Sequence, residues 1–152
     1  MDDRSRECVE RLFDAFNRRD VEGIVELCDE EMEFFAVTAE EVGRREPYVG
    51  SAGLRAYLDD VATVWEDLLV TPKQVEQRPD GSLLVRGRVY LRSRALGIRD
   101  MPTAWIWDLR DGRFTRGQVF IDPEEAIRSF SRAAQPGQSL DPRASRSTTR
   151  LR

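Results

Sequence analysis

The 152-residue sequence contains no histidine. Histidine is the commonest general base near neutral pH and the commonest zinc ligand, so its absence excludes Ser-His and Cys-His nucleophilic catalysis and removes the usual zinc donor. Any acid–base chemistry would therefore fall to Asp, Glu, Tyr, Lys or a water molecule held by Arg. We expect no metal site and no cofactor.

Cysteine is scarce as well, and only Cys8 and Cys28 are present. Both fall on apolar faces of predicted helices, which favours two small buried side chains over a redox pair. The sequence also lacks any run of about 18 apolar residues, the length that a membrane-spanning helix needs. No apolar segment of a secretory signal follows Asp2 and Asp3. These absences predict a cytoplasmic protein without a membrane segment.

The charge balance argues against a nucleic-acid partner. Acidic residues number 28 and basic residues 24, giving a net charge of -4, whereas a nucleic-acid-binding domain normally has a basic excess. The length fits one domain. Residues 135–152 are rich in Ser, Thr and Arg and show no apolar periodicity. We therefore expect one domain over 1–134 and a disordered tail over 135–152.

Hydrophobic periodicity predicts an α+β order of elements. Val9, Leu12, Phe13 and Phe16 recur at the spacing of one helix face. The expected elements are, in order, a helix that ends near 19, a helix over 21–27, a strand over 33–37, a loop over 38–50, a helix over 52–65, strands over about 68–78, 82–95, 102–110 and 113–121, and a helix from 123 to about 134. The expected helix N-caps are Asp20, Ser51 and Asp122.

Alternation along 82–95 separates two faces. Leu83, Val85, Gly87, Val89 and Leu91 form one row, which we expect to face the helices. The other row holds Leu84, Arg86, Arg88, Tyr90, Arg92 and Arg94. It should lie on the outer face of the sheet, solvated or in a dimer interface. RNA contact through these arginines is a minor alternative because few aromatic residues are interleaved with them.

Two tryptophans mark a candidate pocket. Trp105 and Trp107 are two residues apart on one predicted strand and share a face, which we expect to be concave. A two-residue turn at Asp111-Gly112 would place Gln118 opposite Trp105 and Arg116 opposite Trp107. This arrangement predicts a pocket for a flat, apolar ligand with one acidic or carbonyl group. The alternative is a core tryptophan with an arginine stacked at its rim.

Four motifs carry a family resemblance. They are VxxxxxAxNxxDxxxIVxL over 9–27, YxGxxxLRAY over 48–57, AWIWxLRDGRxxR over 104–116 and VFIDPEEAI over 119–127. Together they resemble the SnoaL-like domains of the NTF2-like superfamily, which includes ketosteroid-isomerase-like proteins. The resemblance implies an α+β cone, in which helices pack on the concave face of a curved, mostly antiparallel sheet and leave an apolar pocket.

The same resemblance implies that the best-known catalytic groups of these families are missing. The oxyanion-hole tyrosine of the steroid isomerases would fall at Leu12, and their general-base aspartate at or near Ala36. A histidine of many SnoaL-like proteins is replaced by Trp105, and no predicted strand has the Arg-x-Asp of the limonene-epoxide-hydrolase relatives. The fold alone does not restore a function.

The sequence leaves two hypotheses of different classes. The first is a domain that binds a small hydrophobic molecule, and that as an enzyme would be a cofactor-free isomerase, cyclase or hydratase. Its candidate ligand-binding residues are Trp105, Trp107, Gln118, Phe34, Tyr48 and Trp65, and its weak catalytic candidates are Asp122, Tyr57 and Arg116. The second is a non-catalytic dimerisation or protein-interaction module whose interior is filled by the aromatic residues. A homodimer is expected in either case. An interior cavity of about 300 Å³ or more would favour the first hypothesis, and a closed interior would contradict it.

Overall fold

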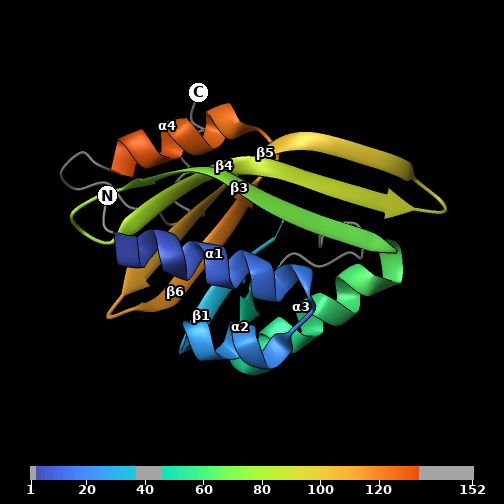
Figure 1. Cartoon of the computed structure of the whole chain (residues 1–152), viewed down its shortest axis with the longest axis horizontal. Helices are drawn as coiled ribbons and strands as arrows, with labels where there is room; N and C mark the ends of the chain where they lie inside the picture. The colour runs from blue at the N-terminus through green and yellow to red at the C-terminus, as the bar shows by residue number, and fades with distance from the viewer. Residues whose placement is uncertain (1–2, 37–45, 134–152) are drawn as a thin grey trace.

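The computed structural model describes residues 3–36 and 46–133. Its elements, shown in Figure 1, are α1 (Asp3–Asn17), α2 (Val21–Leu27), β1 (Cys28–Phe35), β2 (Tyr48–Val49), α3 (Gly50–Val64), β3 (Asp67–Gln77), β4 (Ser82–Ser93), β5 (Gly97–Arg110), β6 (Arg113–Phe120) and α4 (Pro123–Ala133). No helix among these residues is long and apolar enough to cross a membrane. Residues 38–45 of the predicted loop and the predicted tail over 135–152 lie outside the described residues.

The strands form one curved sheet in the order β2-β1-β6-β5-β4-β3. Neighbouring strands are antiparallel except β1 and β6, which are parallel. The expected α+β cone with a mostly antiparallel sheet is therefore confirmed. Figure 1 shows α1, α2 and α3 on one face of the sheet, here the concave face, and α4 on the opposite, outer face.

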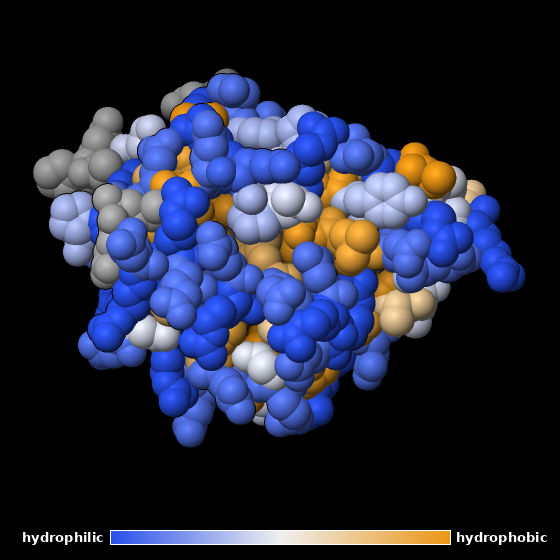
Figure 2. All heavy atoms as spheres, in the orientation of Figure 1, coloured by the Kyte–Doolittle hydropathy of each residue, from blue (hydrophilic) through white to orange (hydrophobic). Residues whose placement is uncertain are grey.

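Both faces of the sheet carry apolar cores. The larger core lies under α1–α3 and takes in the predicted inward residues Leu83, Val85, Val89 and Leu91. A smaller core on the outer face holds Leu84, Ala104, Ile106, Phe120, Ala126 and Phe130. Helix α4 therefore departs from the expected packing of helices on the concave face. Its own apolar residues cover those that β4, β5 and β6 present outward. In Figure 2, polar residues cover most of the visible surface, and apolar residues emerge beside the C-terminal end of α1, below β3.

The predicted helix caps are partly confirmed. The Gly23 backbone N–H donates to Asp20 Oδ1 at 3.1 Å, and the Glu124 N–H donates to Asp122 Oδ1 at 3.0 Å. The prediction for Ser51 is wrong, because α3 already begins at Gly50 and no side chain caps it. Strand β2 also falls within the predicted loop, where Tyr48 and Val49 pair with β1. Two residues are too few to produce a readable alternation.

A bulge in the β5–β6 hairpin overturns the predicted pairing of its side chains. The two-residue turn is present, with Arg110 opposite Arg113, but the register shifts between Asp108 and Leu109. One extra residue on β6, Thr115, absorbs the shift. Trp105 then pairs with Val119 and Trp107 with Gly117. A register shift of one residue moves side chains to the other face of a sheet.

Gln118 and Arg116 consequently do not lie beside the tryptophans. They pair with Ile106 and Asp108, respectively. Because Ile106 belongs to the core under α4, both side chains belong to the outer face. The prediction that this amide and this guanidinium lie beside the two indoles is therefore wrong.

The arginine row of β4 does lie on the outer face, and carboxylates neutralise it. Arg88 Nε is 2.9 Å from Asp100 Oδ1, Arg92 Nε is 2.6 Å from Asp67 Oδ2, and Arg86 pairs with Glu76. The acidic partners come from the flanking strands β3 and β5. The row is thus a ladder of ion pairs rather than the uncompensated basic stripe that nucleic acid attracts.

Gly117 leaves the room that Trp107 occupies. A Cβ atom at Gly117 would lie 2.2 Å from Cζ3 of Trp107. We therefore expect Gly117→Ala to lower the free energy of unfolding by about 1–3 kcal/mol, as overpacking does, measured by urea denaturation. In a Trp107→Leu background the same substitution should cost much less. An equal cost in both backgrounds would contradict the steric explanation.

The buried thiol of Cys28 should be chemically inert in the folded protein. Its side chain is 4% exposed, and burial raises its pKa to about 12. The reactive thiolate is therefore scarce at mildly alkaline pH. A Cys8→Ala variant, which isolates Cys28, should react with Ellman's reagent only after denaturation in guanidinium. Rapid reaction of the native variant would show that the thiol is accessible.

Candidate functional site

Two small cavities lie between the concave face and α1–α3, each of about 50 Å³. The inner cavity is lined by Leu12, Phe13, Phe16, Ile24, Met32, Phe34, Leu54, Tyr57, Leu58, Val70, Trp105 and Trp107. The second cavity, which we call the outer cavity, also lies on the concave side of the sheet. It is lined by Tyr57, Trp65, Leu68, Val70, Val89, Leu91, Arg99, Met101, Thr103, Trp105, Val119 and Ile121. Tyr57, Val70 and Trp105 belong to both linings. The two cavities are therefore neighbours separated by shared side chains.

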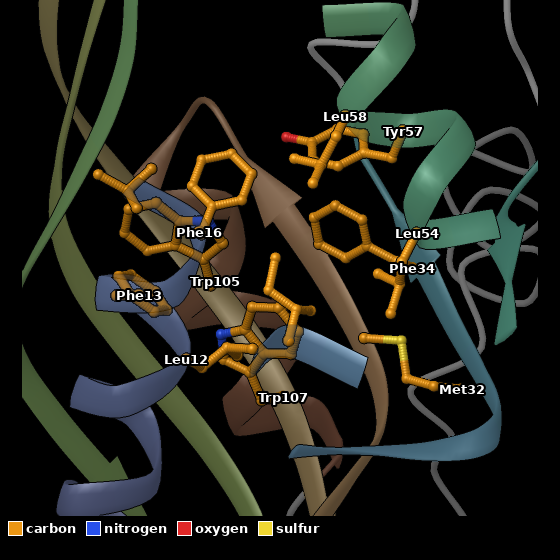
Figure 3. Close-up of a pocket in the computed structure, with 12 residues that line it drawn as sticks. Leu12, Phe13, Phe16, Met32, Phe34, Leu54, Tyr57, Leu58, Trp105 and Trp107 are labelled. Atoms are coloured by element: carbon orange, nitrogen blue, oxygen red, sulfur yellow. The ribbon is translucent and has the colours of Figure 1, made fainter. Parts of the chain in front are cut away.

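Aromatic rings from different elements form the inner cavity (Figure 3). Phe34 of β1 lies parallel to Trp107 of β5, with ring centroids 5.6 Å apart and an interplanar angle of 4°. Phe34 also meets Tyr57 of α3 edge to face at 4.9 Å, and Phe13 of α1 meets Trp105 at 4.8 Å. Such offset and edge-to-face pairs are the arrangements that aromatic rings prefer. They hold two helices, α1 and α3, and two strands, β1 and β5, around one apolar space.

One polar atom in this apolar wall lacks a partner. Trp107 is 5% exposed, and its Nε1 is buried without a hydrogen-bond acceptor among the described residues. Figure 3 shows this nitrogen turned toward Leu12 and Phe13 of α1. Buried N–H groups are partnered in the large majority of cases, so this donor marks a place where an acceptor would be stabilised.

The outer cavity is more polar. Trp65 is 4% exposed, and its Nε1 also lacks an acceptor in the described part of the chain. Arg99 places its Cζ 5.8 Å from the centroid of the Trp65 ring. Thr103 is 2% exposed, and its hydroxyl donates to the Met101 carbonyl at 3.4 Å. The lining of this cavity therefore includes three residues with hydrogen-bonding side chains, Arg99, Trp65 and Thr103.

The end of α1 is tied to β3 beside both cavities. Arg19 donates to the Phe16 carbonyl at 2.7 Å and to the Leu68 carbonyl at 2.8 Å. The Asn17 amide donates to the Val70 carbonyl at 2.8 Å and accepts from its N–H at 2.9 Å. Burial lowers the pKa of Arg19, against the opposing effects of Tyr57 and Asp67. These bonds fix Leu68 and Val70, which line the cavities, against the helix.

Among the described residues, no carboxylate occurs in the lining of either interior cavity. Burial raises the pKa of Asp108, while a hydrogen bond from Ser82 and the charge of Arg116 act against that rise. Asp108 pairs with Arg116 on the outer face, away from the tryptophans. Asp122 is exposed and caps α4. Neither carboxylate is placed to act on a molecule in the interior.

The predicted site residues divide into two groups. The structure brings together Phe34, Tyr57, Trp65, Trp105 and Trp107. The residues outside both linings are Tyr48, Arg116, Gln118 and Asp122.

Tyr48 is almost fully buried behind the cavity wall. Its ring meets Tyr57 at 5.2 Å, and its hydroxyl donates to Asp60 Oδ2 at 2.8 Å. It thus supports a cavity residue without lining a cavity. Leu12 is buried and Ala36 is half-buried; the resemblance to the steroid isomerases would place their tyrosine at Leu12 and their aspartate at or near Ala36.

The sequence reasoning missed Arg99 and Thr103. Both fall near the start of β5, which begins at Gly97 rather than at 102. Counting back in twos from Trp105 reaches Thr103, Met101 and Arg99, so the alternation of the strand puts them on the face of Trp105. The Gly-Ile-Arg-Asp-Met-Pro sequence, with its proline, concealed the strand.

The cavity volumes favour a largely filled interior in this conformation. Each interior cavity measures about 50 Å³, well below the roughly 300 Å³ of a usual small-molecule site. A larger, open groove of about 450 Å³ lies outside, between the end of α3 and the β4–β5 turn. In the described part of the chain, no group of three or more His, Cys, Asp or Glu side chains is placed to hold a metal ion.

Comparison with known proteins identifies the fold family. A family model described as a SnoaL-like domain matches residues 9–117. The chain is similar to the crystal structure of TerC co-crystallised with polyporic acid, with 22% identity, a TM-score of 0.71, and coverage of 82% of this chain and 96% of that chain. None of the curated proteins matches this chain.

Two further solved structures have the same fold. A putative polyketide cyclase from Xanthomonas campestris is 17% identical, with a TM-score of 0.66 and coverage of 83% and 96%. A protein with a ketosteroid-isomerase-like fold from Catenulispora acidiphila, in complex with trimethylamine, is 14% identical, with a TM-score of 0.65 and coverage of 89% and 95%. The family model covers more than half of the chain, and the chain belongs to the SnoaL-like domain family.

Proposed function

We propose that this protein binds a small, flat, mostly apolar molecule in its interior. The observation that carries the proposal is the pair of buried indole N–H groups, of Trp107 at the inner cavity and of Trp65 at the outer one, neither with an acceptor among the described residues. A core that serves only to stabilise a fold leaves few such donors unpaired. A ligand oxygen or ring would satisfy them.

Because each cavity is only about 50 Å³, binding requires the site to open. Tyr57, Val70 and Trp105 form the wall between the cavities, so displacement of the Tyr57 side chain would join them. The structural relatives support a ligand of this kind, since one was crystallised with polyporic acid and another is a putative polyketide cyclase. The aromatic lining suits a planar molecule, which stacks on rings.

The lining favours binding over catalysis. Among the lining residues that the structure describes, the ionisable groups are Tyr57 and Arg99, and none is a carboxylate that could act as a general base. A reaction at this site, an isomerisation, cyclisation or hydration without a cofactor, would depend on the Tyr57 hydroxyl and on the positive charge of Arg99.

The second candidate function is a dimerisation module, and an exposed apolar patch favours it. Leu69 is 46% and Ile98 65% exposed on the outer face of β3 and β5. Tyr90 of β4 lies opposite Leu69, and Ile98 lies opposite Arg92. We call these three residues, Leu69, Tyr90 and Ile98, the outer patch.

The charges around the outer patch suit contact with a second copy. The ion pairs Arg88–Asp100 and Arg92–Asp67 lie on the same strands. A balanced border of both signs does not repel an identical surface turned by a two-fold axis. We therefore propose a homodimer through this patch, which is compatible with ligand binding on the other face of the sheet.

Ligand binding is tested with naphthalene-type planar compounds. Since Trp105 and Trp107 line the inner cavity, binding should change tryptophan emission and raise the melting temperature. Tyr57→Ala, which removes part of the wall between the cavities, should extend binding to compounds with larger rings. Tyr90→Ala, the same change on the outer face, should not. Unchanged emission together with an unchanged melting temperature across the panel would contradict the binding function.

Dimerisation is tested by light scattering coupled to size-exclusion chromatography. The wild-type protein should have twice the mass of one chain. Ile98→Glu should shift it to the monomer, because a charge is costly to bury in an apolar interface. The control is Val49→Glu, at a comparably exposed residue of β2, which should remain a dimer. A monomeric wild-type protein at high concentration would refute the interface.

A further inference from the structure

We infer that the outer cavity recognises an acidic oxygen group of the ligand, such as a carboxylate or an ionised enol or phenol, through Arg99 and the indole N–H of Trp65. This inference rests on the proposed binding function and adds to it. The ligand would then be a planar aromatic acid, with its ring in the inner cavity and its acidic oxygens in the outer one.

The polar groups at the outer cavity are mainly hydrogen-bond donors. The lining of the outer cavity includes Arg99, Trp65, Thr103 and Tyr57, and no Asp or Glu among the described residues. A guanidinium and an indole N–H only donate hydrogen bonds, and hydroxyls donate as well as accept. A set of this kind is complementary to a group that accepts.

The positive charge of Arg99 has no carboxylate partner among the described residues. No carboxylate of the described residues forms an ion pair with Arg99, whereas the outer-face arginines of β4 are paired. Arg99 belongs to the concave side, because it pairs with the inward Leu91. Its Cζ is 5.8 Å from the Trp65 ring centroid. The aromatic ring holds the cation at the cavity wall without neutralising it.

The indole N–H of Trp65 has no hydrogen-bond acceptor among the described residues. A buried N–H without an acceptor is an unfavourable state that a ligand oxygen would relieve. A carboxylate has two oxygens, and it can accept from the guanidinium and from the indole N–H together. The inner cavity, with Phe34 stacked on Trp107, offers only apolar and aromatic surface to the rest of the molecule.

The experiment compares two probes of the same shape, 2-naphthoate and 2-naphthamide, by isothermal titration calorimetry. The wild-type protein should bind the naphthoate on the order of tenfold more tightly, as expected for hydrogen bonds to a charged group. Arg99→Gln should remove most of that preference and leave the affinity for the naphthamide nearly unchanged. Arg99 is exposed, so this substitution spares the fold.

Arg113→Gln is the matched control, because Arg113 is an exposed arginine at the β5–β6 turn, and it should bind both probes like the wild type. Equal wild-type affinity for the two probes, or an equal loss of both in Arg99→Gln, would overturn the acidic-group assignment and leave the apolar site standing. Failure of both probes to bind the wild-type protein would remove the proposed function and this assignment together.

Discussion

The indole of Trp107 lies directly over the backbone of Gly117, where a single Cβ would come within 2.2 Å of the ring. The rest of the interior is arranged around this contact. The bulge at Thr115 sets Gly117 rather than a larger residue opposite Trp107. The ring then stacks on Phe34 and meets Phe13 and Phe114 edge to face. These partners come from α1, β1 and β6. The register of β5 against β6 therefore determines how α1 packs on the sheet.

The arginines on the two faces of the sheet have different partners. On the outer face, Arg86, Arg88 and Arg92 are matched by carboxylates from the neighbouring strands, and surface ion pairs of this kind add little to stability. On the concave side, Arg99 stands beside an indole and has no carboxylate partner among the described residues. Arg99 thus combines a place in a cavity lining with the lack of an ion pair to a described carboxylate.

The chain has the cone fold, and no carboxylate of the described residues lines either interior cavity. Leu12 closes the inner cavity with a hydrocarbon side chain, and Ala36 follows β1 without a carboxylate. What remains in the interior are indole N–H groups, two hydroxyls and a cation at the edge. Such groups hold and orient an acceptor, but they provide no general base near neutral pH.

Packing explains why the interior has little free volume. Large rings at positions 13, 16, 34, 57, 105 and 107 share one space between α1, α3 and the sheet, and most of that space is occupied by the rings themselves. The apolar side chains that would contact a ligand also contact one another in its absence. Binding would exchange some of these ring–ring contacts for ring–ligand contacts, at the cost of moving Tyr57 or Trp105.

The sequence by itself determined the features that depend on local spacing. The periodicity of Val9, Leu12 and Phe13 predicted α1, and the alternation of β4 predicted which of its residues face the helices, because both patterns follow from backbone geometry. The tertiary structure alone decided that Gln118 and Arg116 face away from the tryptophans, that α4 covers the outer face and that Arg99 reaches a cavity. A one-residue bulge reverses the faces without any change in apparent alternation, and cavity volume depends on how side chains distant in sequence fill a shared space.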